Sequence, residues 1–152
     1  MKTLELKHIA PYLPYNVMVQ EIRLDQFTKD VSEKIYILHP DDVTLLRLSF
    51  DHIKSKKLVL RPPSDLTKEI EVNGEKFVPA EKLKEINSGI DVFLTRDFQT
   101  DDLMICTNPS DVDLDIMWYH LIISKLLEWH FDIFNLIPVG LAIDFNALNQ
   151  TK

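Results

Sequence analysis

An Asn73-Gly74 pair constrains the fold of this chain most, because it encodes a tight β-hairpin. Both central positions of the favoured two-residue hairpin turns need a positive φ, and Asn-Gly is the preferred pair there. Closing the chain at this turn pairs Ile70 with Phe77 and Glu71 with Lys76. One apolar pair and one opposite-charge pair support the same register, so the sequence predicts two antiparallel strands.

A long apolar helix is the second strong signal. Ser110 suits an N-cap position and Asp113 follows it like the second member of a capping box, so we expect a helix over about 111–130. At about 100° per residue, one broad face of this helix is apolar. It holds Trp118, Trp129, Ile122, Leu126, Tyr119, Ile123, Ile116, Leu127 and Phe131. An arc of this width predicts a helix buried against a sheet.

Shorter alternating segments predict the other strands. Val17 and Val19 alternate in one phase. Ile22 and Leu24 alternate in the opposite phase, which indicates a bulge or bend near Gln20–Glu21. Further strands are expected at 34–38, 43–50, 58–60 and 141–145, with a short helix beginning near Pro79 and a loop-rich acidic stretch at 91–109.

These elements together predict a single α+β domain over residues 1–152. Its sheet is expected to be mostly antiparallel, with the long C-terminal helix packed on it.

Charge is distributed unevenly along the chain. The net charge is −7, and residues 90–152 carry all of it, with 3 basic against 10 acidic side chains. This balance disfavours nucleic acid and anionic membranes, which attract Lys and Arg, but leaves a basic protein partner open. The sequence leaves undecided whether the acidic stretch 91–115 is a binding surface or a solvated loop.

The compartment follows from what the sequence lacks. Cys106 is the single cysteine, so no intrachain disulfide is expected. We expect no signal peptide at the start, and no apolar segment approaches the roughly 18 residues that a membrane span requires. A cytoplasmic protein is therefore expected.

Known catalytic motifs are missing. The chain has 3 glycines, too few for a phosphate loop or a dinucleotide fingerprint, and it contains no G-x-S-x-G or H-E-x-x-H. The acidic run at 111–115 fails as a calcium loop, because Ile116 and Ile122 stand where Gly and Glu are required. We therefore assign no catalytic, cofactor or metal residue.

Six residues remain as candidates for interaction. Asp111, Asp113 and Asp115 would favour the positive end of the long helix, or contact a partner. His130 falls within the apolar arc and is either a core imidazole or the centre of a small active site. In the second case Asp132 or Asp144 would assist it.

Two segments carry a resemblance to other proteins. One runs from Leu60 through the Asn73-Gly74 turn to Pro79, and the other from Leu127 to Asp144. Together they resemble a group of small uncharacterised proteins encoded by phages, prophages and mobile elements of gut bacteria, although Pro63 stands where that group has an apolar residue. The resemblance implies a bacterial host cytoplasm and transfers no functional residue.

Three functions follow as hypotheses. The first is a non-enzymatic accessory protein of a phage or mobile element that contacts an unknown host or phage protein. The second is an acidic decoy that occupies the basic surface of a host nucleic-acid-binding protein. The third is a small enzyme centred on His130.

Overall fold

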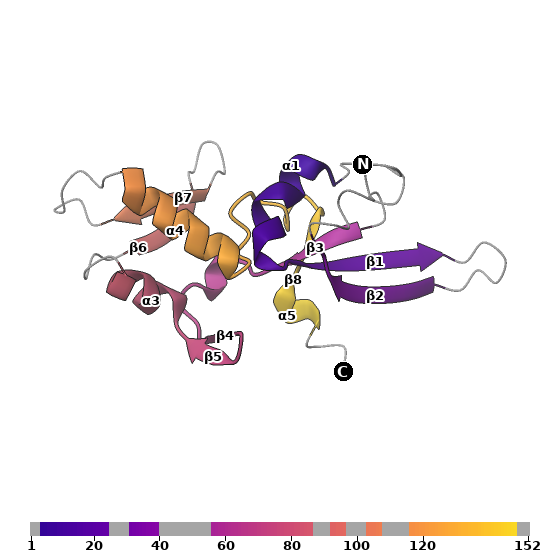
Figure 1. Cartoon of the computed structure of the whole chain (residues 1–152), viewed down its shortest axis with the longest axis horizontal. Helices are drawn as coiled ribbons and strands as arrows, with labels where there is room; N and C mark the ends of the chain where they lie inside the picture. Colours follow the sequence, from indigo (N-terminus) through magenta and orange to yellow (C-terminus); the bar gives the residue numbers. More distant parts are fainter. Residues whose placement is uncertain are drawn as a thin grey trace. The chain divides into compact units, whose positions relative to one another are not determined.

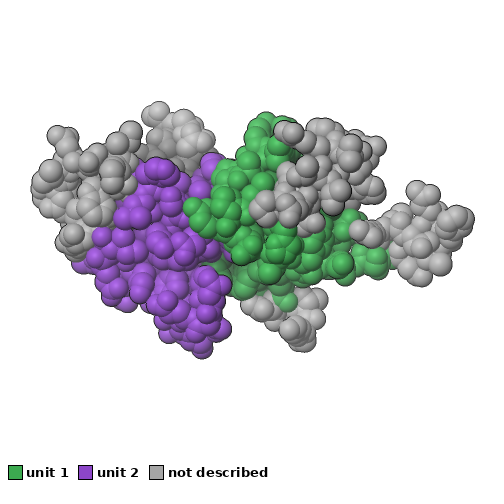
Figure 2. Space-filling view, in the orientation of Figure 1, with its two compact units in different colours: residues 1–61, 136–152 green, residues 62–135 purple. Residues whose placement is uncertain are grey.

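The computed structural model describes residues 4–24, 31–39, 56–86, 92–96, 103–107 and 116–148. The chain divides into two compact units, which Figure 2 colours separately. Unit 1 combines Met1–Arg61 with Leu136–Lys152, and unit 2 comprises Pro62–Asn135. The mixture of helices and mostly antiparallel strands confirms the α+β class. The single domain expected over residues 1–152 stays a prediction.

Unit 1 is built around a four-stranded sheet (Figure 1). Its strands are β1 (Met18–Leu24), β2 (Val31–Ile37), β3 (Lys56–Leu60) and β8 (Ala142–Asp144), and its helical segments are α1 (Leu6–Ile9), η1 (Ala10–Tyr15) and α5 (Phe145–Leu148). The strand order is β2-β1-β3-β8. β1 pairs antiparallel with both β2 and β3, whereas β3 and β8 are parallel.

Unit 2 contains two hairpins, two α-helices and a short 3-10 helix among its described residues. These elements are η3 (Pro63–Asp65), β4 (Ile70–Val72), β5 (Glu75–Phe77), α3 (Pro79–Ile86), β6 (Val92–Arg96), β7 (Leu103–Thr107) and α4 (Ile116–Glu128). β4 pairs with β5 and β6 pairs with β7, both antiparallel.

The Asn-Gly hairpin forms in the predicted register. Ile70 lies opposite Phe77 and Glu71 opposite Lys76. Asn73 and Gly74 adopt φ values of 52° and 83°, as the two-residue turn requires. The helix that follows also begins at Pro79, where a missing N–H costs nothing.

The predicted long helix is shorter than expected. α4 has 13 residues and ends at Glu128, while 111–115 lie outside the described residues. His130 ends it, because a residue with φ of 60° cannot continue a right-handed helix. The His130 N–H donates to the Leu127 carbonyl and the Phe131 N–H to the Leu126 carbonyl, at 3.0 and 2.8 Å. These two bonds form a Schellman motif, which sequence periodicity alone did not indicate.

The core of unit 2 surrounds the C-terminal half of α4. It comprises Leu66, Ile70, Leu83, Ile122, Leu126, Trp129 and Phe131. The Phe77 ring packs on Trp129 with their centroids 5.0 Å apart, so the β4–β5 hairpin is part of this core. The buried stripe is narrower than the predicted arc, because Tyr119 and Ile123 are exposed.

Three other predicted segments differ from the structure or lie outside the residues that it describes. The stretch 91–109, expected to be rich in loops, contains the paired strands β6 and β7. The last strand ends at Asp144, where α5 begins, rather than continuing through Phe145. The expected strand at 43–50 lies outside the described residues. Among those residues, no helix has the length and apolar character needed to cross a bilayer.

Candidate interaction surface on the β1–β2 hairpin

β1 and β2 form a hairpin whose two faces differ in chemistry. Their register is unbroken from the Met18–Ile37 pair to the Leu24–Val31 pair, so β1 contains no bulge. The bulge that was one of the two expectations near Gln20–Glu21 is therefore wrong, and the bend stays a prediction. Successive side chains on each strand alternate between an inner and an outer face.

The inner face explains why the bulge was predicted. Val17 and Val19 are buried there, and Glu21 is buried in the next position of the same phase. A carboxylate thus occupies a site where periodicity calls for an apolar side chain. The apolar Ile22 is left on the outer face, where it is 43% exposed.

Two lysines face Glu21 across the sheet. Its direct partners are Lys34 on β2 and Lys56 on β3. Both lysine Nζ atoms also lie 5.6 Å from the centroid of the Tyr36 ring. Opposite charges at facing positions of a sheet stabilise it, so the two lysines offset part of the cost of placing a carboxylate at a core position.

The outer face collects exposed apolar side chains. We call Ile22, Val31, Ile35 and Ile37 the hairpin patch. Val31 is 68% exposed, Ile35 41% and Ile37 46%. Between them, Gln20 Nε2 donates a hydrogen bond of 2.5 Å to Glu33 Oε1, which holds one carboxylate among the apolar groups. Alternation over Val31-Ser32-Glu33-Lys34-Ile35-Tyr36-Ile37 is the sequence signal for this surface, but it does not reveal which face the unit buries.

The outer edge of β2 pairs with no other strand that the structure describes. Within the described part of the chain, β1 is the one strand paired with β2. The Leu38 N–H donates to the Val17 carbonyl at 2.8 Å, so even-numbered residues of β2 point their backbone groups toward β1. The N–H and C=O groups of Val31, Glu33, Ile35 and Ile37 therefore point away from it.

The predicted site residue His130 has a structural position at the end of α4. It adopts φ of 60° and donates its backbone N–H within the Schellman motif. Its side chain is half-buried, and Asp132 close by in the chain is buried. Catalysis by this pair stays a prediction.

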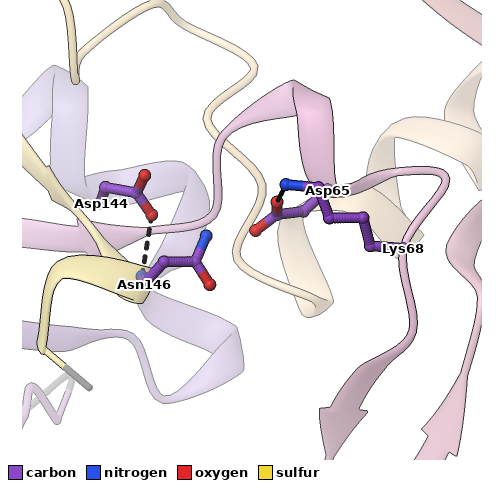
Figure 3. A network of polar contacts seen from close by, with 4 residues as sticks. All are labelled: Asp65, Lys68, Asp144 and Asn146. Carbon is purple, nitrogen blue, oxygen red and sulfur yellow. Dashed lines mark hydrogen bonds and ion pairs between the residues drawn. The ribbon is translucent and has the colours of Figure 1, made fainter. Parts of the chain in front are cut away.

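Asp144, the other carboxylate considered with His130, caps a short helix in unit 1. Its Oδ1 accepts a hydrogen bond of 2.8 Å from the backbone N–H of Asn146 (Figure 3). This is the bond an N-cap aspartate makes at the start of a helix, and α5 begins at the next residue.

The acidic second half of the chain is described only in part. Asp111, Asp113 and Asp115 lie outside the described residues. Of the acidic residues within them, Glu128 Oε2 accepts from Lys125 Nζ at 2.7 Å, Asp132 is buried and Asp144 caps α5. None of these three contributes an exposed, unengaged carboxylate to a decoy surface.

Two further polar pairs have local structural roles. The Oδ1 atom of buried Asp65 lies 2.7 Å from Lys68 Nζ (Figure 3). This ion pair stabilises the turn after η3. On α4, His120 is exposed, and its Nδ1 lies 3.3 Å from Ser124 Oγ. No group of three or more potential metal ligands occurs within the described segments.

Two pKa shifts mark the beginning of α1. A hydrogen bond from Lys7, together with its positive charge, lowers the pKa of Glu5. Burial and the charge of Lys7 lower the pKa of His8. The neutral His8 ring accepts the Glu5 backbone N–H at its Nδ1, 3.0 Å away, which closes a capping box.

Comparison with protein-family models, curated proteins and solved structures finds no match to this chain.

Proposed function

We propose that this chain is a non-enzymatic accessory protein that acts by binding another protein through the outer face of its β1–β2 hairpin. The hairpin patch carries this proposal. Its four side chains account for nearly half of the large exposed apolar residues in the described part of the chain, and all four share one face. Exposed apolar side chains gathered on one face are typical of interaction sites, whereas scattered ones are not.

The free energy available from this patch is modest. Fully burying an isoleucine or valine contributes about 1.5–3 kcal/mol, and these side chains are already about half covered. Covering all four would therefore contribute about 3–5 kcal/mol before the costs of association. Such a surface suits a partner that also supplies polar contacts.

Glu33 defines what those polar contacts are. It lies among the patch residues, with Gln20 bound to one carboxylate oxygen. A partner with apolar side chains around a lysine or arginine would match this face, because the cation would pair with Glu33 while the apolar groups cover the isoleucines.

The origin of the partner follows from the resemblance to phage and mobile-element proteins. We assign it to a host or phage protein in the bacterial cytoplasm. The other two hypotheses, an acidic decoy and a small enzyme at His130, have no described geometry in their favour.

Affinity capture from host lysate tests this function. The immobilised chain is compared with its Ile22→Asn variant, and Ile123→Asn on the exposed side of α4 is the matched control. We expect the wild type and the control to capture a protein that Ile22→Asn does not. Purified, that protein should bind the Glu33→Lys variant about tenfold more weakly, since this change replaces attraction by repulsion. Equal capture by wild type and Ile22→Asn would refute the proposal.

A further inference from the structure

The outer edge of β2 offers a second, separate contact. The strand is seven residues long, contains no proline and keeps an unbroken register with β1. Edge strands of natural proteins are usually shortened, bulged, or interrupted by proline or inward-pointing charges. β2 is neither shortened, bulged nor interrupted by proline. Its one inward-pointing charge, Lys34, lies beside Tyr36, whose ring a lysine can contact, so a further strand can pair with this edge.

We propose that this edge pairs antiparallel with β2 of a second copy of the chain, around a two-fold axis at Ile35. The proposal concerns the edge of the strand, whereas the proposed function concerns its outer face. Either one can therefore fail without the other.

Symmetry and charge exclude some of the possible registers. A two-fold pairing must be centred on a single residue if side chains of both copies are to alternate in phase. Centring on Lys34 would oppose two ammonium groups, and centring on Glu33 would oppose two carboxylates. Like charges directly opposite one another destabilise a sheet, so both registers are disfavoured.

The register centred on Ile35 avoids both conflicts. It places Ile35 opposite its own copy on the outer face, and Lys34 opposite Tyr36 on the inner face. Within one chain, the Lys34 Nζ already lies 5.6 Å from the Tyr36 ring centroid, so the partner's lysine would repeat an existing cation–π contact. Five residues of each strand, Glu33–Ile37, would pair.

The backbone is compatible with this register. Glu33, Ile35 and Ile37 point their N–H and C=O groups toward the outer edge, and this register makes them the hydrogen-bonded pairs. The strand carries one negative and one positive side chain, so it is locally neutral although the chain carries −7. These features favour a second copy over an unrelated strand. In a two-fold dimer each favourable cross-strand pair, such as Lys34 with Tyr36, occurs twice.

A charge exchange at Ile35 tests the pairing. We expect the full-length chain to sediment at twice its monomer mass as its concentration rises. Ile35→Glu and Ile35→Lys, each alone, should weaken association about a hundredfold, because identical charges would face each other. An equal mixture of the two variants should restore the dimer. A wild type that stays monomeric, or a mixture that does not associate, would overturn the proposal.

Cysteine cross-linking tests the register independently, in a Cys106→Ser background that leaves one thiol. Residues directly opposite in a hydrogen-bonded pair have Cα atoms about 5.5 Å apart, within reach of a disulfide. Ile35→Cys should therefore cross-link with itself. Glu33→Cys should cross-link with Ile37→Cys but not with itself. Self-cross-linking of Glu33→Cys in preference to Ile35→Cys would overturn this register.

Discussion

The β4–β5 and β1–β2 hairpins place their apolar side chains in opposite ways. In β4–β5, Ile70 is buried and Phe77 packs on Trp129, so its apolar pair serves the core of unit 2. In β1–β2, Glu21 is buried while Ile35 and Ile37 are exposed. The first hairpin satisfies its own unit. The second leaves apolar surface that its unit does not use, which is typical of a strand pair that contacts another molecule.

An alanine substitution in each hairpin should separate these roles. Ile70→Ala should lower the free energy of unfolding by about 2–5 kcal/mol, because it leaves a cavity in a packed core. Ile35→Ala should cost less than about 1 kcal/mol, since its side chain is already exposed. Urea denaturation of dilute protein measures both. Equal losses would show that the outer face of β1–β2 is part of the folding core, and the contrast would fail.

Glu21 should contribute more to stability than a carboxylate on the other face of the same hairpin. Glu21→Gln keeps the side-chain volume but removes the charge that faces Lys34 and Lys56, so we expect a loss of about 1–3 kcal/mol. Glu33→Gln on the exposed face is the control and should stay within about 0.5 kcal/mol. A Glu21→Gln variant as stable as the control would contradict the account of the inner face.

The turn of β4–β5 should be sensitive to backbone strain alone. Gly74 has φ of 83°, and no atom lies within 4 Å of the position a Cβ would take. Gly74→Ala should therefore cost about 1–2 kcal/mol from the left-handed backbone and nothing from crowding. Thermal unfolding measures the change. A neutral substitution would mean that this turn does not set the hairpin register.

The smallest effect is a pH dependence at α1. The folded pKa of His8 lies below its ordinary value of 6.5, so the folded state disfavours the protonated ring. The associated stability is present above pH 6.5 and is lost as the pH falls through the lowered pKa. An NMR titration should show the His8 midpoint lower in folded than in urea-unfolded protein, and higher in Lys7→Gln than in wild type. A folded midpoint at or above the unfolded one would contradict this assignment.

The sequence predicted best those elements whose geometry depends on a few neighbouring residues. The Asn73-Gly74 turn and Pro79 fixed the hairpin and the start of α3, because both act over a few residues. The end of α4 was predicted less well, since His130 carries no glycine-like signal for a left-handed backbone.

The exposed apolar face of the β1–β2 hairpin could not be predicted, because Glu21 on the opposite face is buried where periodicity calls for an apolar side chain. Periodicity assigns apolar residues to the inside, but Glu21 is inside, where two lysines on neighbouring strands lie opposite it in the register. β3 is distant from β1 in the sequence, so the pairing of Lys56 with Glu21 is not visible in a local pattern. Once the pairing is known, Ile22, Ile35 and Ile37 must lie on the opposite face.

Amide hydrogen exchange along β2, measured by NMR at increasing protein concentration, tests most directly whether the outer edge of this strand pairs with another chain. The N–H groups of Ser32, Lys34 and Tyr36 point toward β1 and should be protected at every concentration. Those of Glu33, Ile35 and Ile37 should exchange freely in dilute protein and become protected as the concentration rises. If these three amides stay unprotected at the highest concentration while the first three remain protected, β2 has no partner on its edge.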